Sequence, residues 1–195
     1  MKNFFQKTIK ENKKRGFTIL ETMVAIFILV LSITGPMVFA QSGLRTAFLS
    51  RDQITAFFLA QDAIETIKNI RDDNGLDGRD WLENIYVCGA DTTQNCVIYI
   101  DTLAYEPVSE ICSGSECPIL KVNSNNQFGY NFDVGENAEN SRFTRILNVK
   151  EVAPGRELQI VAEIRWTSNI RVGGARILVQ ENIYNWIPNT QPATP

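Results

Sequence analysis

The feature that most constrains this chain is an apolar run of 28 residues, from Phe17 to Leu44, in which Glu21 is the only charged residue. About 20 apolar residues in a helix cross a hydrocarbon core about 30 Å thick, so the run is long enough to span a membrane. It is also longer than the apolar core of a secretory signal peptide, which has about 7–15 residues. A carboxylate in such a span costs about 2.5–3.5 kcal/mol on insertion scales, which makes Glu21 a candidate functional residue.

Charge is distributed unevenly around this run. Residues 1–15 carry six cations and one glutamate, a net charge of +5, whereas the whole chain carries −3, so the other 180 residues carry −8. A basic segment before an apolar span favours a cytoplasmic N-terminus, with the acidic remainder on the far side of the membrane. An acidic outer part argues against nucleic acid as a general electrostatic partner.

The chain contains no histidine. This excludes Ser-His and Cys-His nucleophile pairs and removes the commonest metal ligand. Carboxylate-based or lysine-based catalysis stays open, but no motif for it is visible. We therefore predict no catalytic residue, no metal site, no cofactor and no small-molecule substrate.

Four cysteines, Cys88, Cys96, Cys112 and Cys117, lie on the side predicted to be translocated, where an even number favours disulfides. Three pairings are possible. Short loops that contain glycine or serine favour Cys88–Cys96 and Cys112–Cys117. Four-thiolate zinc is the alternative, but C-x7-C and C-x4-C spacings fit the usual zinc knuckles poorly.

The apolar run leads into an amphipathic segment. Gly35-Pro36 lies late in the run and predicts a kink or a locally unwound turn, because proline removes a helical hydrogen bond. Residues 45–71 then show helical periodicity, so residues 17–71 are expected to form one helix. The predicted core-facing residues of the second half are Ile54, Phe57, Phe58, Ala60, Ile64, Ile67 and Ile70, opposite Arg51, Asp52, Asp62, Glu65 and Lys68.

The segment RDDNGLDG, residues 71–78, is expected to end this helix, because Asn-Gly and Asp-Gly are strong turn dipeptides. Its acidic residues invite a calcium-loop interpretation. The EF-hand pattern fails, however, because aspartate stands at 77, where that loop requires glycine, and leucine stands at 76. A solvated helix end is the favoured interpretation.

The rest of the chain predicts an antiparallel sheet, and the fold class is therefore α+β. Candidate strands in the loop-rich middle are residues 97–103, 118–122 and 128–134. Three clearer runs follow at 143–152, 157–166 and 175–186, separated by short turns. In the second of these runs Leu158, Ile160, Ala162, Ile164 and Trp166 alternate with a second set, which is typical of a half-buried strand. That second set is Gln159, Val161, Glu163, Arg165 and Thr167.

The sequence around the start of the apolar run, GFTILE at residues 16–21 after a basic leader, resembles the class III signal of type IV pilins and pseudopilins. The resemblance is strong over residues 13–40 and looser over 41–71, and the usual Leu-Ile appears here as Ile19-Leu20. It implies cleavage by a prepilin peptidase between Gly16 and Phe17, followed by methylation of the new Phe17 amine. Glycine before the cut lets the backbone approach a catalytic site closely.

The resemblance also gives Glu21 a role. Four residues after Phe17, it would share a helical face with it and could neutralise the Phe17 ammonium of a neighbouring subunit, which would enforce axial register. The alternative is a membrane-edge glutamate that reaches the headgroups.

Taken together, the expected regions are a cleaved leader (1–16), a transmembrane and filament-core helix (17–44), an amphipathic helix (45–71), a sheet domain (72–190) and a disordered tail (191–195). The resemblance implies a structural subunit, a minor pilin or pseudopilin of a type IV filament, secretion pseudopilus or DNA-uptake pilus. Its implied partners are the peptidase, other pilin subunits, an inner-membrane assembly platform and membrane lipid. Its implied location is the bacterial cytoplasmic membrane, with the ectodomain outside, and then the filament. The competing hypothesis is a membrane-anchored binding module or enzyme that never assembles.

Overall fold

The structure is a computed structural model that describes residues 16–88, 94–101, 104–112, 116–132, 137–168 and 171–186. The predicted leader up to residue 15 and the predicted tail at 191–195 lie outside the described residues. The chain divides into two units, Met1–Ala47 and Phe48–Pro195. The division into a span and an amphipathic half at residue 44 stays a prediction.

One continuous helix, α1, runs from Ile19 to Leu76 and belongs partly to each unit. It begins two residues later and ends five residues later than the predicted helix. Asp77-Gly78 forms a turn as expected, with Gly78 at a φ of 71°. The predicted turn at Asn74-Gly75 is wrong, because Asn74 is buried within the last helical turn and donates from Nδ2 to the Glu83 carbonyl at 2.8 Å.

In the first unit, every described residue from Gly16 to Ala47 is exposed. The helix assignment continues through Gly35 and Pro36, so the predicted unwound turn is absent, whereas a bend at Pro36 stays a prediction. The hydroxyls of Ser32 and Thr34 donate to the carbonyls of Leu29 and Val30, at 2.8 and 2.7 Å. Pro36 has no N–H to donate to the Ser32 carbonyl. The two hydroxyls donate to other carbonyls, so they do not replace this missing hydrogen bond.

In the second unit, α1 contributes one buried face to the core. The predicted contributions of Ala60, Ile64, Ile67 and Ile70 are confirmed. Those of Ile54, Phe57 and Phe58 are wrong, since these residues are 57%, 40% and 63% exposed. Ala56, Leu59 and Ala63 occupy the buried face in their place, and Asp52, which was expected on the polar side, is buried as well.

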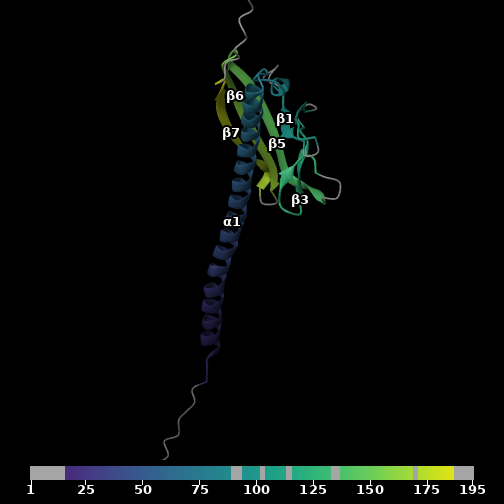
Figure 1. Cartoon of the computed structure of the whole chain (residues 1–195). Coiled ribbons are helices and arrows are strands. Elements are labelled where there is room, and N and C mark those ends of the chain that lie inside the picture. The colour runs from purple at the N-terminus through teal and green to yellow at the C-terminus, as the bar shows by residue number, and fades with distance from the viewer. Residues whose placement is uncertain are drawn as a thin grey trace, which may run out of the picture. The chain divides into compact units, whose positions relative to one another are not determined.

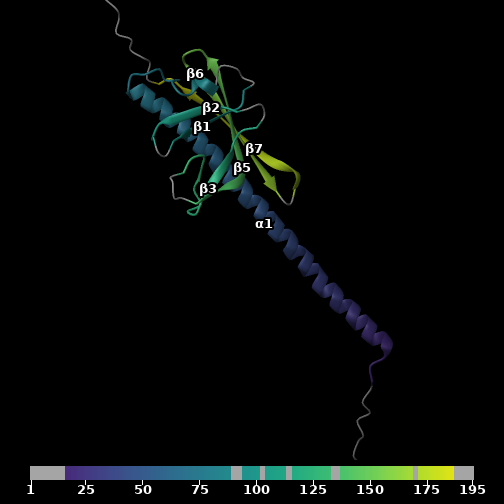
Figure 2. The ribbon, with the colours of Figure 1, turned by 90° about the vertical axis from the view of Figure 1, so that its right-hand side faces the viewer.

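Among the described residues, seven strands form one antiparallel sheet, as expected for an α+β chain. Figures 1 and 2 show this sheet beside the second part of α1. β5 is central. It pairs with β6 along one edge, and β3 and β1 pair with it along the other. β2 extends the sheet from β1, β4 from β3 and β7 from β6. The strands are β1 (Cys96–Ile100), β2 (Pro107–Ile111), β3 (Ile119–Asn123), β4 (Phe128–Gly129), β5 (Ala138–Ala153), β6 (Glu157–Ser168) and β7 (Arg171–Tyr184).

The predicted alternation in β6 is confirmed. Leu158, Ile160, Ala162, Ile164 and Trp166 are all buried, and of the intervening residues only Glu163 is also buried. The turn before β6 has Pro154 followed by Gly155 at a φ of 68°, and the Arg156 N–H donates to the Ala153 carbonyl at 3.0 Å. Proline and then a positive-φ glycine is the pattern of a type II turn.

The middle of the sheet differs more from the prediction. β1, β3 and β4 lie within or beside the candidate strands, but β4 has only 2 residues. β2 was not predicted, and β5 begins five residues before the predicted run.

Both predicted disulfides are present, Cys88–Cys96 and Cys112–Cys117, with Cα–Cα distances of 5.5 and 4.8 Å. Cys88 ends the short 3-10 helix η1 (Tyr86–Cys88). These disulfides remove the four-thiolate zinc alternative.

Candidate processing and assembly site

The predicted cleavage segment lies immediately before α1. Gly16, Phe17 and Thr18 are outside any helix or strand, and all three are exposed. A Cβ placed on Gly16 would meet nothing within 4 Å. The peptide bond between Gly16 and Phe17 therefore lies in an open, irregular segment, which is a form of backbone that a peptidase can reach.

The first turn of α1 is closed by a threonine that the sequence interpretation did not single out. Thr18 precedes the helix, and its Oγ1 accepts a hydrogen bond from the Glu21 N–H at 3.2 Å. Thr-x-x-Glu is the sequence of a capping box, in which an N-cap side chain binds the amide three residues later. The spacing of Thr18 and Glu21 was a signal sufficient to predict this cap.

Glu21 lies in this first turn and is exposed. A carboxylate there is stabilised by the positive end of the helix dipole, by about 0.3–1 kcal/mol. The helix starts at Ile19, so Phe17 is not yet helical. The shared helical face of Phe17 and Glu21, expected from their four-residue spacing, is thus absent from the described chain, and pairing of Glu21 with a neighbour's amine stays a prediction.

In the second unit, two ion pairs connect α1 to β5, and neither was predicted. Buried Asp52 binds Arg142 at 3.1 Å between Oδ2 and Nη1. Buried Arg145 binds Asp62 at 2.7 Å, also between Nη1 and Oδ2, and its guanidinium lies 5.4 Å from the Tyr130 ring centroid. Arg142 and Arg145 are three residues apart in β5, whereas their partners Asp52 and Asp62 are ten residues apart in α1. The sequence shows the charges, but only the tertiary structure pairs them.

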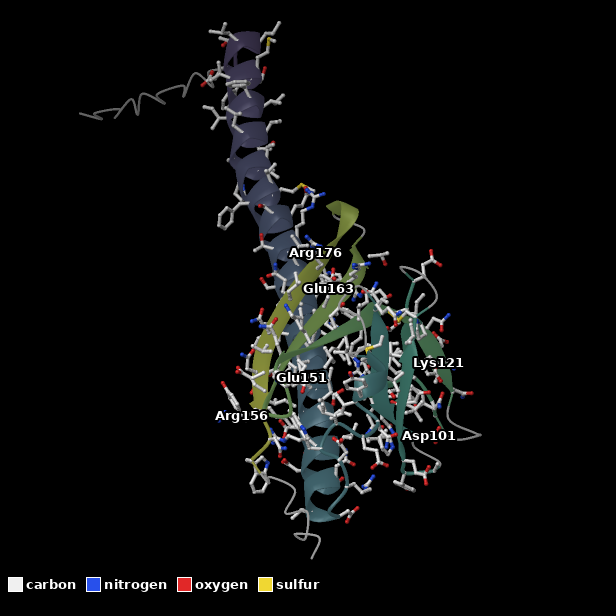
Figure 3. All side chains as sticks on the ribbon, turned by 90° about the horizontal axis from the view of Figure 1, so that it is seen from above. Asp101, Lys121, Glu151, Arg156, Glu163 and Arg176 are labelled. Atoms are coloured by element: carbon white, nitrogen blue, oxygen red, sulfur yellow. A yellow bond between two sulfur atoms is a disulfide. The ribbon has the colours of Figure 1, made fainter. Side chains whose placement is uncertain are left out.

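A further charge cluster lies on β6 and β7. Glu163 accepts from Arg165 Nε at 2.8 Å and Nη2 at 3.1 Å, and Arg176 of β7 lies 3.6 Å away. Figure 3 shows Glu163 and Arg176 beside each other on the neighbouring strands. The hydrogen bonds from Arg165 lower the pKa of Glu163 below its ordinary value of 4.5. In the described part of the chain, no group of three or more Asp, Glu or Cys side chains is arranged to hold a metal ion.

One comparison with known proteins decides what the N-terminal segment is. Residues 12–35 match the family model described as the prokaryotic N-terminal methylation motif. The chain carries the type IV pilin signal. The matched residues include Gly16, Phe17 and Glu21. Pro36 is the first residue beyond them. Comparison with curated proteins and with solved structures gave no significant match.

The helix behind the pilin signal has the length and composition of a membrane span. An 18-residue window in α1 has a mean hydropathy of 2.4, and none of that window is buried. Together with the signal, this indicates membrane anchoring through the first part of α1. The methylation motif and the apolar helix behind it support a type IV pilin-like subunit.

Proposed function

We propose that this chain is a minor pilin or pseudopilin, a structural subunit of a type IV filament, secretion pseudopilus or DNA-uptake pilus. The carrying observation is the pilin signal directly followed by an apolar helix with no buried residue through Ala47. An apolar surface of this kind requires lipid or other apolar helices around it. A pilin subunit uses both in turn, lipid before assembly and neighbouring helices within the filament.

In this proposal a prepilin peptidase cleaves between Gly16 and Phe17 and methylates the new amine. The subunit then rests in the bacterial cytoplasmic membrane, with its sheet unit outside. An inner-membrane assembly platform moves it into the filament, where it contacts other pilin subunits. The outer location is supported by the disulfides Cys88–Cys96 and Cys112–Cys117, because disulfides persist in oxidising compartments.

Glu21 has the register role in this proposal. Among packed helices, its carboxylate neutralises the Phe17 ammonium of a neighbouring subunit, and a misplaced subunit leaves both charges unpaired. Removing one partner of a buried ion pair costs about 3–5 kcal/mol, enough to select one axial position. The helix-cap bond at the Glu21 N–H leaves its side chain available for this contact.

Mass spectrometry of protein purified from native membranes tests the processing step. The expected mature chain begins with N-methylated Phe17. Gly16→Leu should abolish cleavage, because its side chain blocks close approach of the backbone. Gly43→Leu is the matched control, since Gly43 also has open space around it but lies beyond the signal, and it should be processed normally.

A mature protein that begins at Met1, or within the apolar run, would contradict the proposal. It would favour the alternative of a membrane-anchored binding module or enzyme that is not assembled into filaments.

A further inference from the structure

We propose that the second unit binds a neutral sugar in a pocket between α1 and the β1, β3–β4 and β5 segments. The pocket has a volume of about 420 Å³, and we call it the aromatic pocket. Pockets that hold small ligands have volumes of about 300–1,000 Å³. Asp62 and Thr66 line it from the helix, and Tyr99, Phe128, Phe132 and Arg145 line it from the sheet side.

The aromatic walls are held in place by the core behind them. The Tyr99 ring lies 5.0 Å from the Tyr130 ring, and the Phe128 ring lies 5.8 Å from the buried Phe143 ring, in an edge-to-face arrangement. Phe132 lies over Gly129: a Cβ added to Gly129 would be only 3.3 Å from the Cζ atom of Phe132. Tyr99, Phe128 and Phe132 are each half-buried, so part of their surface remains open to a ligand. The apolar C–H face of a sugar ring packs on surfaces of this kind.

The polar part of the aromatic pocket is equally well supported. The Arg145 side chain is only 5% exposed and binds Asp62 Oδ2 at 2.7 Å, whereas the Asp62 side chain is 63% exposed. The arginine therefore orients a carboxylate that a ligand can reach. Arg145 Nε is buried and has no hydrogen-bond partner among the described residues, so the guanidinium has one donor that the folded chain leaves unused. Adjacent sugar hydroxyls supply both the donors and the acceptors that this pair needs.

The charge around the pocket favours a neutral ligand over an anion. Arg145 and Asp62, the charged side chains that line it, balance each other. Burial, and then the carboxylates of Glu110 and Asp101, raise the pKa of Tyr99, so its phenol stays protonated and can donate. Asp101, labelled in Figure 3, also accepts from Asn131 Nδ2 at 3.0 Å at the pocket's side. These carboxylates oppose an incoming anion.

A purely apolar ligand is also disfavoured. Asp62, Thr66, Gln127 and Asn131 all line the pocket together with the aromatic rings. Covering these polar groups without replacing their hydrogen bonds to water costs free energy. Hydroxyl groups and C–H faces on one small molecule satisfy both kinds of surface, which is the chemistry of a sugar.

Saturation-transfer NMR on the full chain tests this inference, in micelles of a zwitterionic detergent that has no sugar headgroup. The probes are the neutral trisaccharides of N-acetylglucosamine and of glucose, and saturation is expected to pass to at least one of them. Tyr99→Phe should weaken binding about fivefold, the effect of one lost hydrogen bond. Phe132→Ala should weaken it about tenfold by removing one aromatic wall.

Two variants serve as matched controls because neither residue lines the pocket. Tyr184→Phe removes an exposed phenol elsewhere, and Phe57→Ala removes a half-exposed ring on α1, so both should bind like the unaltered chain. Circular dichroism checks that Tyr99→Phe and Phe132→Ala are folded.

Three results would overturn the inference: no transfer to either trisaccharide, equal binding by Tyr99→Phe and the unaltered chain, or tighter binding of the acidic trigalacturonate than of the neutral probes. None of them bears on the proposed filament role, because the aromatic pocket lies outside residues 12–35, which carry the pilin signal.

Discussion

The two parts of α1 differ in how hydrophobicity relates to burial. Residues 19–47 are the more apolar part, yet all of them are exposed. Residues 48–76 contain many charged side chains, yet they bury a continuous face that includes Ile64, Ile67 and Ile70. The comparison teaches that an apolar residue is buried only where another part of the structure is available to pack against it, and that hydrophobicity alone does not decide its burial. The second part has a sheet within its own unit, whereas the first part depends on lipid or on other chains.

The largest expected effect concerns Glu21 in the first part. Under the proposed filament role, Glu21→Ala should impair incorporation into filaments, because the proposed partner of a neighbouring subunit's Phe17 ammonium is removed. Membrane insertion should not suffer, since the mutation removes a charge that is costly in lipid. Western blotting should find processed protein in the inner membrane and little in sheared filaments. Normal incorporation would remove the register role and leave Glu21 as a helix-end or peptidase-recognition residue.

A matched pair of truncations compares the two parts of α1 directly. Ile67→Ala should destabilise the second unit by about 2–5 kcal/mol, because Ile67 has no exposed surface and its removal leaves a cavity. Ile28→Ala should leave the unfolding of that unit unchanged, because Ile28 is 60% exposed and lies in the first unit. Denaturant unfolding of the full chain in micelles, followed by tryptophan fluorescence, measures both. Equal losses would show that the first part also stabilises the sheet unit.

The disulfides provide the next effect, again confined to the second unit. Replacing Cys88 and Cys96 by alanine should cost about 2.5 kcal/mol, and replacing Cys112 and Cys117 about 2 kcal/mol, from loop separations of 8 and 5 residues. The longer loop constrains the unfolded chain more. Unfolding midpoints of the two double variants give the order. The reverse order would mean that packing around the sulfurs outweighs loop entropy.

A smaller effect tests the corrected face of α1. Phe58→Ser should change the free energy of unfolding by no more than about 0.5 kcal/mol, because the Phe58 side chain is 63% exposed. Leu59→Ser, one residue further on, should cost several times more, because Leu59 is buried. Thermal unfolding of the two variants distinguishes the faces. A large loss for Phe58→Ser would restore the face predicted from the sequence.

The smallest effect is a pH dependence. Because the folded pKa of Glu163 is lowered, its ionised form contributes stability above its ordinary pKa of 4.5. This contribution is lost as the pH falls below 4.5 through the folded pKa. Glu163→Gln should therefore lose less stability than the unaltered chain between neutral and acidic pH. Glu65→Gln, on the exposed face of α1, should follow the unaltered chain, and a steeper acid loss in Glu163→Gln would contradict the assignment.

Local patterns were sufficient to predict several features. The signal at residues 16–21, the apolar run, the alternation of β6 and both disulfides could be predicted because each depends on neighbours a few residues away. The Thr18 cap was equally local, but Glu21 was interpreted only through its charge. β2 and the first residues of β5 were missed because they are short or polar, and pairing with β1 and β3 creates them.

The sequence by itself determined that this chain has a pilin-type signal, an apolar helix and an antiparallel sheet. Only the tertiary structure decided which side of α1 faces that sheet. Ala56, Ala60 and Ala63 are fully buried, whereas the larger Phe57 and Phe58 stay outside. Small side chains let a helix approach its partner closely, and close packing gains more contacts than two bulky rings that would hold the surfaces apart. The same approach brings Asp52 and Asp62 within reach of Arg142 and Arg145, a pairing that no local pattern contains.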